Sequence, residues 1–185
     1  MTRRRQLTLP SRRRLETHGF TLLELMVVMM IIAVIAAIAI PGLIRARMSG
    51  NEASAIGSMR AIHNSQVTYA QACGGGGFAT SLGDLATPPN GGGAPFISPD
   101  LAANGVVKAG YAVLLVPGAG AAPVRAAAST CNSTLSQSSY HATATPMTIG
   151  VSGSRAFATN GSGAVFESYS GAVIPPTLAG SHLLQ

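Results

Sequence analysis

Residues 19–44, GFTLLELMVVMMIIAVIAAIAIPGLI, decide the fold of this chain. The twenty residues from Leu25 to Ile44 carry no formal charge. A helix of that length is about what is needed to cross a hydrocarbon core of roughly 30 Å. The remainder of the 18.7 kDa chain offers no comparably apolar surface to cover it. We therefore predict a membrane-spanning helix with one carboxylate, Glu24, at its beginning.

The charges in front of this run predict its orientation. Six arginines precede it, and they are Arg3, Arg4, Arg5, Arg12, Arg13 and Arg14. Positively charged flanks remain on the cytoplasmic side of a membrane. The N-terminus is thus expected in the cytoplasm, and the chain after Ile44 is expected outside it.

The basic segment ends at Gly19, directly before the apolar run. A secretory signal would instead carry its small-residue cleavage site after the run, so that the run is removed. A cut after Gly19 would release residues 1–19, keep the apolar helix and create a new amine at Phe20.

The segment GFTLLELMVVMMIIAVIAAIAIPGLIRAR resembles the prepilin signature of type IV pilins and type II secretion pseudopilins, with a match from Gly19 to about Ile62. The resemblance implies that a prepilin peptidase cleaves between Gly19 and Phe20 and that the same enzyme N-methylates Phe20. It also implies the pilin architecture of a long helix packed on a sheet.

Glu24 needs a physical explanation, because a carboxylate at the centre of a membrane helix costs about 2.5–3.5 kcal/mol, and less near the interface. The resemblance implies that its partner is the amine of Phe20 on a neighbouring subunit. That pairing would neutralise both groups and set the register of assembly. The alternative is an interfacial carboxylate that stays hydrated.

The net charge of +6 and the pI of about 10.2 belong mainly to the leader. After removal of residues 1–19, six basic and five acidic side chains remain, which leaves a formal charge of +1. The precursor's charge is therefore a topology signal. It gives no indication of nucleic-acid binding.

Beyond the apolar run, residues spaced three and four apart form one face of a continuing helix: Met48, Glu52, Ala55, Met59, Ile62, Gln66, Tyr69 and Cys73. We expect this face to pack on a globular domain; a solvated linker helix is the alternative. A helix from Phe20 to about Ala72 would have 53 residues and span roughly 80 Å. Pro41 and Gly42 predict a break in it, as a kink or a melted segment.

The chain therefore divides into a cleaved leader (1–19), a transmembrane and filament-core helix (20–44), its amphipathic continuation (45–73) and an extracytoplasmic domain (74–185). The last part is rich in small residues and turn signals. Four strands are expected at 110–116, 140–145, 155–159 and 164–168, with residues 160–163 as a hairpin connection. The predicted class is α+β, with the helix on an antiparallel sheet of about four strands.

Cys73 and Cys131 are the only cysteines, and both are predicted to lie outside the cytoplasm. An oxidising compartment favours a disulfide between them. It would close a loop of 57 intervening residues and stabilise the fold by roughly 4 kcal/mol. The alternative is a pair of free buried thiols.

No spacing of nucleophiles, bases or metal ligands predicts an enzyme or a resident cofactor. Calcium is the one metal considered, because Asp84, Asp100 and Glu167 could meet around it, although scattered acids are usually solvated. Metal ligands are otherwise not expected.

The leading hypothesis is a structural subunit of a type IV pilus, a helical homo-oligomer. Its implied partners are the prepilin peptidase, the inner membrane, and the assembly platform with its ATPase. The chain would sit in the inner membrane before assembly and in an extracellular pilus afterwards. The alternatives are a type II secretion pseudopilin in a periplasmic pseudopilus, and a bitopic membrane protein with an extracytoplasmic binding domain that never polymerises.

Overall fold

A computed structural model describes residues 19–184 of the chain. These residues belong to two units, which divide between Pro41 and Gly42. The expected leader lies outside the described residues except for Gly19.

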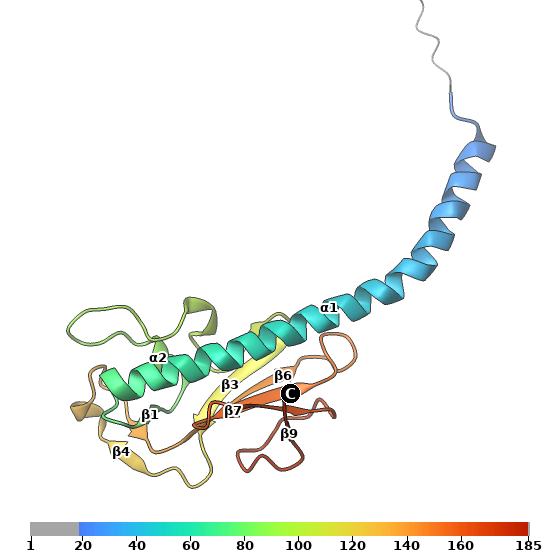
Figure 1. Cartoon of the computed structure of the whole chain (residues 1–185). Helices are drawn as coiled ribbons and strands as arrows, with labels where there is room; N and C mark the ends of the chain where they lie inside the picture. Colours follow the sequence, from blue (N-terminus) through green and yellow to red (C-terminus); the bar gives the residue numbers. More distant parts are fainter. Residues whose placement is uncertain (1–18, 185) are drawn as a thin grey trace, which may run out of the picture. The chain divides into compact units, whose positions relative to one another are not determined.

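Helix α1 (Leu22–Ala72) is 51 residues long, close to the length predicted from the sequence (Figure 1). The helix continues through Pro41 and Gly42, so this structure shows no melted segment there, and a kink, the other form of the predicted break, stays a prediction. The physical reason is that a proline removes a single backbone donor. Alanine, isoleucine and leucine on both sides supply enough helix propensity to continue through one missing hydrogen bond.

The second unit contains an antiparallel sheet of six strands in the order β2-β3-β6-β7-β8-β9. The strands are β2 (Val106–Lys108), β3 (Tyr111–Pro117), β6 (Tyr140–Pro146), β7 (Ala156–Asn160), β8 (Val165–Ser168) and β9 (His182–Leu183). The central pair, β3 and β6, is aligned from Tyr111 opposite Pro146 to Pro117 opposite Tyr140. The β2–β3 and β7–β8 connections are short, whereas residues 118–139 separate the paired strands β3 and β6.

A small second sheet lies at the end of the unit where α1 stops (Figure 1). It has the order β1-β5-β4 and consists of β1 (Phe78–Ala79), β5 (Ser136–Gln137) and β4 (Pro123–Arg125). Helix α2 (Leu82–Ala86) and two short 3-10 helices, η1 (Pro99–Leu101) and η2 (Ala127–Ser129), complete the elements.

The α+β class is confirmed, but the strand count of about four is too small. All four predicted strands exist within one residue of their expected ends, and the connection 160–163 joins β7 to β8 as predicted. The strands that were missed are two or three residues long. Segments that short cannot display the alternation that identifies a strand in sequence.

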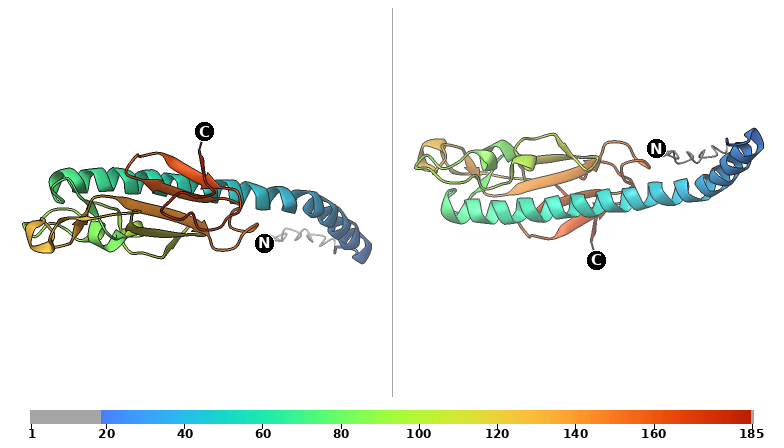
Figure 2. Two further views of the ribbon diagram at one scale, coloured as in Figure 1. Left: turned by 90° about the horizontal axis from the view of Figure 1, so that it is seen from below. Right: turned by 90° about the horizontal axis from the view of Figure 1, so that it is seen from above.

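Helix α1 runs along one face of the large sheet (Figure 2), and the core residues come from both elements. The helix contributes Ala55, Met59, Ile62 and Tyr69, all nearly inaccessible to solvent. Strand β6 opposes the helix with the small residues Ala142 and Ala144, while β3 supplies larger side chains such as Leu115. The opposite face of the sheet has a smaller cluster around Ala156, Ala158 and Ile174.

The disulfide predicted between Cys73 and Cys131 is present, with the two Cα atoms 4.9 Å apart. It connects the residue after α1 to the loop before β5. Next to it, the amide of Asn132 donates to the carbonyl oxygens of Asp84 and Thr87. The C-terminal end of the helix is thereby attached covalently to the sheet domain.

We predict that the double variant Cys73→Ser/Cys131→Ser loses roughly 4 kcal/mol of unfolding free energy, because the unfolded chain regains the entropy of the open loop. Chemical denaturation of the full chain in detergent, with and without reductant, measures this. Reductant should destabilise the parent protein to the level of the variant and leave the variant unchanged. Equal stability of the oxidised parent and the variant would contradict the prediction.

Candidate functional site

The peptide bond between Gly19 and Phe20 lies outside any helix or strand and is open to solvent. The Phe20 side chain is 77% exposed, and apart from its chain neighbours no described residue lies within 4 Å of the position that a Cβ on Gly19 would occupy. Exposed, irregular backbone is the usual substrate of a peptidase. The predicted cleavage and methylation positions are therefore sterically accessible, and their use by an enzyme remains a prediction.

Thr21 begins the helix in a way that the sequence analysis missed. Its hydroxyl oxygen accepts a hydrogen bond of 3.2 Å from the backbone N–H of Glu24, and its carbonyl oxygen accepts one from Leu25. This is the first half of a capping box, whose Thr-x-x-Glu spacing was visible in the sequence. Glu24 therefore lies in the first turn, where a carboxylate interacts favourably with the helix dipole.

The apolar half of α1 exposes its large side chains on every side. Those between Leu22 and Ile44 range from 43% exposed at Val28 to 78% at Ile38. The most apolar window of α1 has a mean hydropathy of 2.9, and none of it is buried within the described chain. By length and composition this helix could cross a membrane. Its surface fits membrane insertion.

The amphipathic half of α1 behaves as its spacing predicts. Met48 is half-buried, and the other predicted members of the face are buried, namely Glu52, Ala55, Met59, Ile62, Gln66, Tyr69 and Cys73. Gln66 is polar but satisfied, because its amide group exchanges two hydrogen bonds with the backbone of Ala79 at 2.8 and 2.9 Å. The alternative of a solvated linker helix is excluded by this burial.

The buried carboxylate Glu52 is held by the turn before β7. Arg155 donates to its Oε2 from Nε at 2.9 Å and from Nη2 at 2.7 Å. Glu52 Oε1 accepts from the backbone N–H of Ser154 at 2.9 Å and from its hydroxyl at 3.0 Å. Sequence spacing could not have identified Arg155 as the partner, since it lies 103 residues away.

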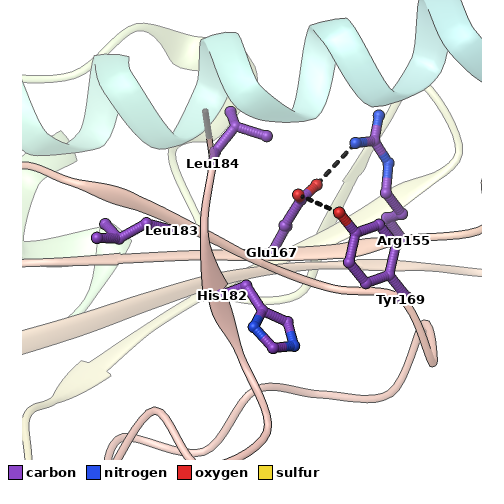
Figure 3. A pocket seen from close by; sticks show the side chains of 6 residues that line it. All are labelled: Arg155, Glu167, Tyr169, His182, Leu183 and Leu184. Carbon is purple, nitrogen blue, oxygen red and sulfur yellow. Dashed lines mark hydrogen bonds and ion pairs between the residues drawn. The ribbon is translucent and has the colours of Figure 1, made fainter.

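A second carboxylate, Glu167 on β8, completes the ion-pair network of Glu52, Arg155 and Glu167. Arg155 Nη1 donates to Glu167 Oε2 at 2.7 Å, and the Tyr169 hydroxyl donates to Glu167 Oε1 at 2.8 Å. Figure 3 shows these contacts in the pocket that His182, Leu183 and Leu184 also line. The guanidinium already donates to two carboxylates, so the pocket presents no free cation.

This network shifts the pKa of its members. Burial raises the pKa of Glu52, but hydrogen bonds from Ser154 and Arg155 outweigh it, so that the pKa lies below the ordinary value of 4.5. The hydrogen bond to Glu52 raises the pKa of Arg155. Both groups are therefore charged at neutral pH and fasten α1 to the sheet.

The acids considered for calcium are not brought together. Asp84 accepts from the backbone N–H and hydroxyl of Thr80, Asp100 pairs with Lys108, and Glu167 pairs with Arg155. Within residues 19–184 no group of three or more His, Cys, Asp or Glu residues has an arrangement that could hold a metal ion. The structure offers no shared site for the three acids.

Residues 16–40 match the prokaryotic N-terminal methylation motif, the signature of type IV pilins and pseudopilins. The match covers the leader junction, Glu24 and most of the apolar half of α1. It supports a pilin-like class of protein, whose members are usually structural and non-enzymatic. Comparison with curated proteins and with solved structures gave no match.

We predict that Glu52→Gln lowers the unfolding free energy by about 2 kcal/mol at neutral pH, because it removes a charge-assisted contact to Arg155. The lowered pKa of Glu52 stabilises the fold above about pH 4.5, and this contribution is lost as the pH falls through the pKa of the folded state. The variant should therefore lose less stability on acidification than the parent. Circular dichroism of denaturation at several pH values measures both effects.

The matched control is Asp100→Asn, which removes one partner of the exposed pair with Lys108. Solvent screens exposed pairs, so this variant should leave the stability at neutral pH nearly unchanged. A Glu52→Gln variant as stable as this control would show that the network does not fasten the helix.

Proposed function

We propose that the chain is a structural subunit of a type IV pilus. A prepilin peptidase removes residues 1–19 and methylates the amine of Phe20. The processed chain resides in the inner membrane, and an assembly platform with its ATPase transfers α1 into a helical filament. The product is an extracellular pilus, and the chain itself carries out no catalysis.

The observation that carries the proposal is an exposed, non-helical Gly19–Phe20 junction directly before an apolar helix that has no partner within the described residues. Every large apolar side chain from Leu22 to Ile44 is exposed, so this surface requires lipid before assembly and other copies of the helix afterwards. A filament core built from such helices satisfies both requirements. The methylation motif over residues 16–40 supports the same order of events.

Glu24 has a specific role in this proposal. Cleavage after Gly19 places the new amine of Phe20 four residues before Glu24, at the same end of the helix. As helices leave the lipid, each carboxylate can pair with the amine of a neighbouring copy, which removes two isolated charges from an apolar interior. The pairing fixes the axial register of the subunits.

The disulfide favours a filament exposed to an oxidising environment, which a surface pilus and a periplasmic pseudopilus share. A type II secretion pseudopilin is therefore the second candidate, with the same N-terminal processing. The location of the assembled chain distinguishes the two.

Mass spectrometry of filaments sheared from the cell surface tests the proposal. We expect an abundant peptide that begins with N-methylated Phe20. The same peptide confined to the cell envelope would replace the pilus with a pseudopilus. Retention of residues 1–19 on the chain would contradict both and favour a bitopic protein that does not polymerise.

We also predict that Glu24→Gln is processed normally but assembles poorly. Loss of a buried charge pair costs about 3–5 kcal/mol, which corresponds to a filament yield lower by at least about a hundredfold. The control Thr21→Ala removes the helix cap but keeps the carboxylate, and it should cost about 1 kcal/mol, or about fivefold in yield. Equal losses in the two variants would assign Glu24 to helix capping and contradict its role in assembly.

A further inference from the structure

The first seven residues of the connection between β6 and β7, residues 147–153 (MTIGVSG), carry no charge and expose apolar side chains. Met147 is 59% exposed, Ile149 is 59% exposed and Val151 is 65% exposed. Contiguous exposed apolar groups on a surface loop usually mark a site of interaction. We refer to residues 147–153 as the basal loop.

The basal loop lies at the end of the second unit where α1 enters it (Figures 1 and 2). The Asn51 side-chain amide donates a 2.9 Å hydrogen bond to the carbonyl oxygen of Ser152, which fixes the loop beside the helix. Asn51 is seven residues beyond Ile44, the last residue of the apolar run, which corresponds to about 10 Å along a helix. The loop is thus next to the point where a membrane-spanning segment would emerge.

The basal loop is internally hydrogen-bonded, so its apolar side chains are held outward. Thr148 O accepts from the backbone N–H groups of Val151 and Ser152, and Gly150 donates to the carbonyl oxygen of Gly153 at 2.9 Å. Gly153 also permits a close approach to β3, because a Cβ at this position would lie 1.9 Å from the Tyr111 hydroxyl oxygen. An ordered loop can insert its side chains without a further loss of backbone entropy.

The two charged side chains in residues 42–51 of α1, beside the loop, are both positive. Arg45 and Arg47 on α1 are exposed, and no acidic residue occurs in 42–51 or 147–153. The next acid along the helix, Glu52, is bound to Arg155. Exposed arginines next to apolar side chains are complementary to an anionic lipid surface, where each is worth about 1 kcal/mol.

We propose that the basal loop docks on an anionic lipid surface while the chain is still in the membrane. Met147, Ile149 and Val151 enter the interface, and Arg45 and Arg47 contact lipid phosphates. The loop acts as a second anchor that orients the sheet domain before extraction. This proposal rests on the membrane-anchored stage of the proposed function.

The chain contains no tryptophan, so a single introduced one reports on its own position. We would introduce Val151→Trp into the full chain and reconstitute the variant in vesicles of phosphatidylglycerol and brominated phosphatidylcholine. The measurement is the quenching of tryptophan fluorescence by the brominated lipid. Strong quenching is expected, because interfacial side chains lie roughly 5–10 Å into the headgroup boundary. Ile149→Trp should give the same result, and Arg45→Gln/Arg47→Gln should weaken quenching when phosphatidylglycerol is present.

Two further variants distinguish a failure of the basal-loop proposal from a failure of the proposed membrane-anchored function. Val124 on β4 lies next to Gly77, past the C-terminal end of α1. This end of the helix is about 30 Å from Asn51 along the helix axis. The fluorescence of Val124→Trp should therefore not be quenched. Ile35→Trp reports the span itself. Quenching of Ile35→Trp with none at Val151→Trp overturns the basal-loop proposal alone, whereas no quenching at either position overturns the membrane-anchored function.

A second copy of the chain is the competing occupant of the basal loop. In that case the emission of Val151→Trp would shift with the protein-to-lipid ratio and would not depend on phosphatidylglycerol. This result would overturn the lipid proposal and assign the loop to contacts between subunits.

Discussion

One constraint governs this protein: the apolar surface of α1 from Leu22 to Ile44 has no partner within the described chain. Burial of a single side chain such as leucine or isoleucine is worth about 1.5–3 kcal/mol. Several of them together exceed the roughly 5–15 kcal/mol that stabilises a typical domain. The first half of the helix must therefore be buried by something outside the chain, first lipid and then, in our account, further copies of itself. In our account, cleavage after Gly19 creates an amine at Phe20, and this amine and Glu24 are tolerated in that setting because they neutralise each other.

The second half of the same helix meets the opposite condition, because its apolar face is covered by its own sheet. It is fastened near its beginning by the ion pair of Glu52 and Arg155, and just after its end by the Cys73–Cys131 disulfide. Between these two points the small residues of β6 allow close packing. In a filament, a force on the helix would therefore reach the sheet through two separate attachments and a packed interface.

Much of this could be predicted from sequence, because the strongest signals are local. The charge-free run, the leader junction, the three-and-four spacing of Met48 to Cys73, and the four longer strands all depend on neighbouring residues. The disulfide followed from cysteine count and compartment. The ion pair of Glu52 with Arg155 could not be predicted, since nothing local connects residues 103 apart. The short strands lacked a readable period. The Thr21 cap was readable from its spacing with Glu24 and was overlooked.

The most direct test of the central claim is a cryo-electron microscopy map of filaments sheared from cells that produce this chain. Our account predicts that residues 22–44 of many copies form the filament core, with each Glu24 carboxylate within ion-pair distance of the methylated amine of a neighbouring Phe20. A map in which the apolar half of α1 lies on the filament surface, or in which this chain is absent from the filaments, would contradict it.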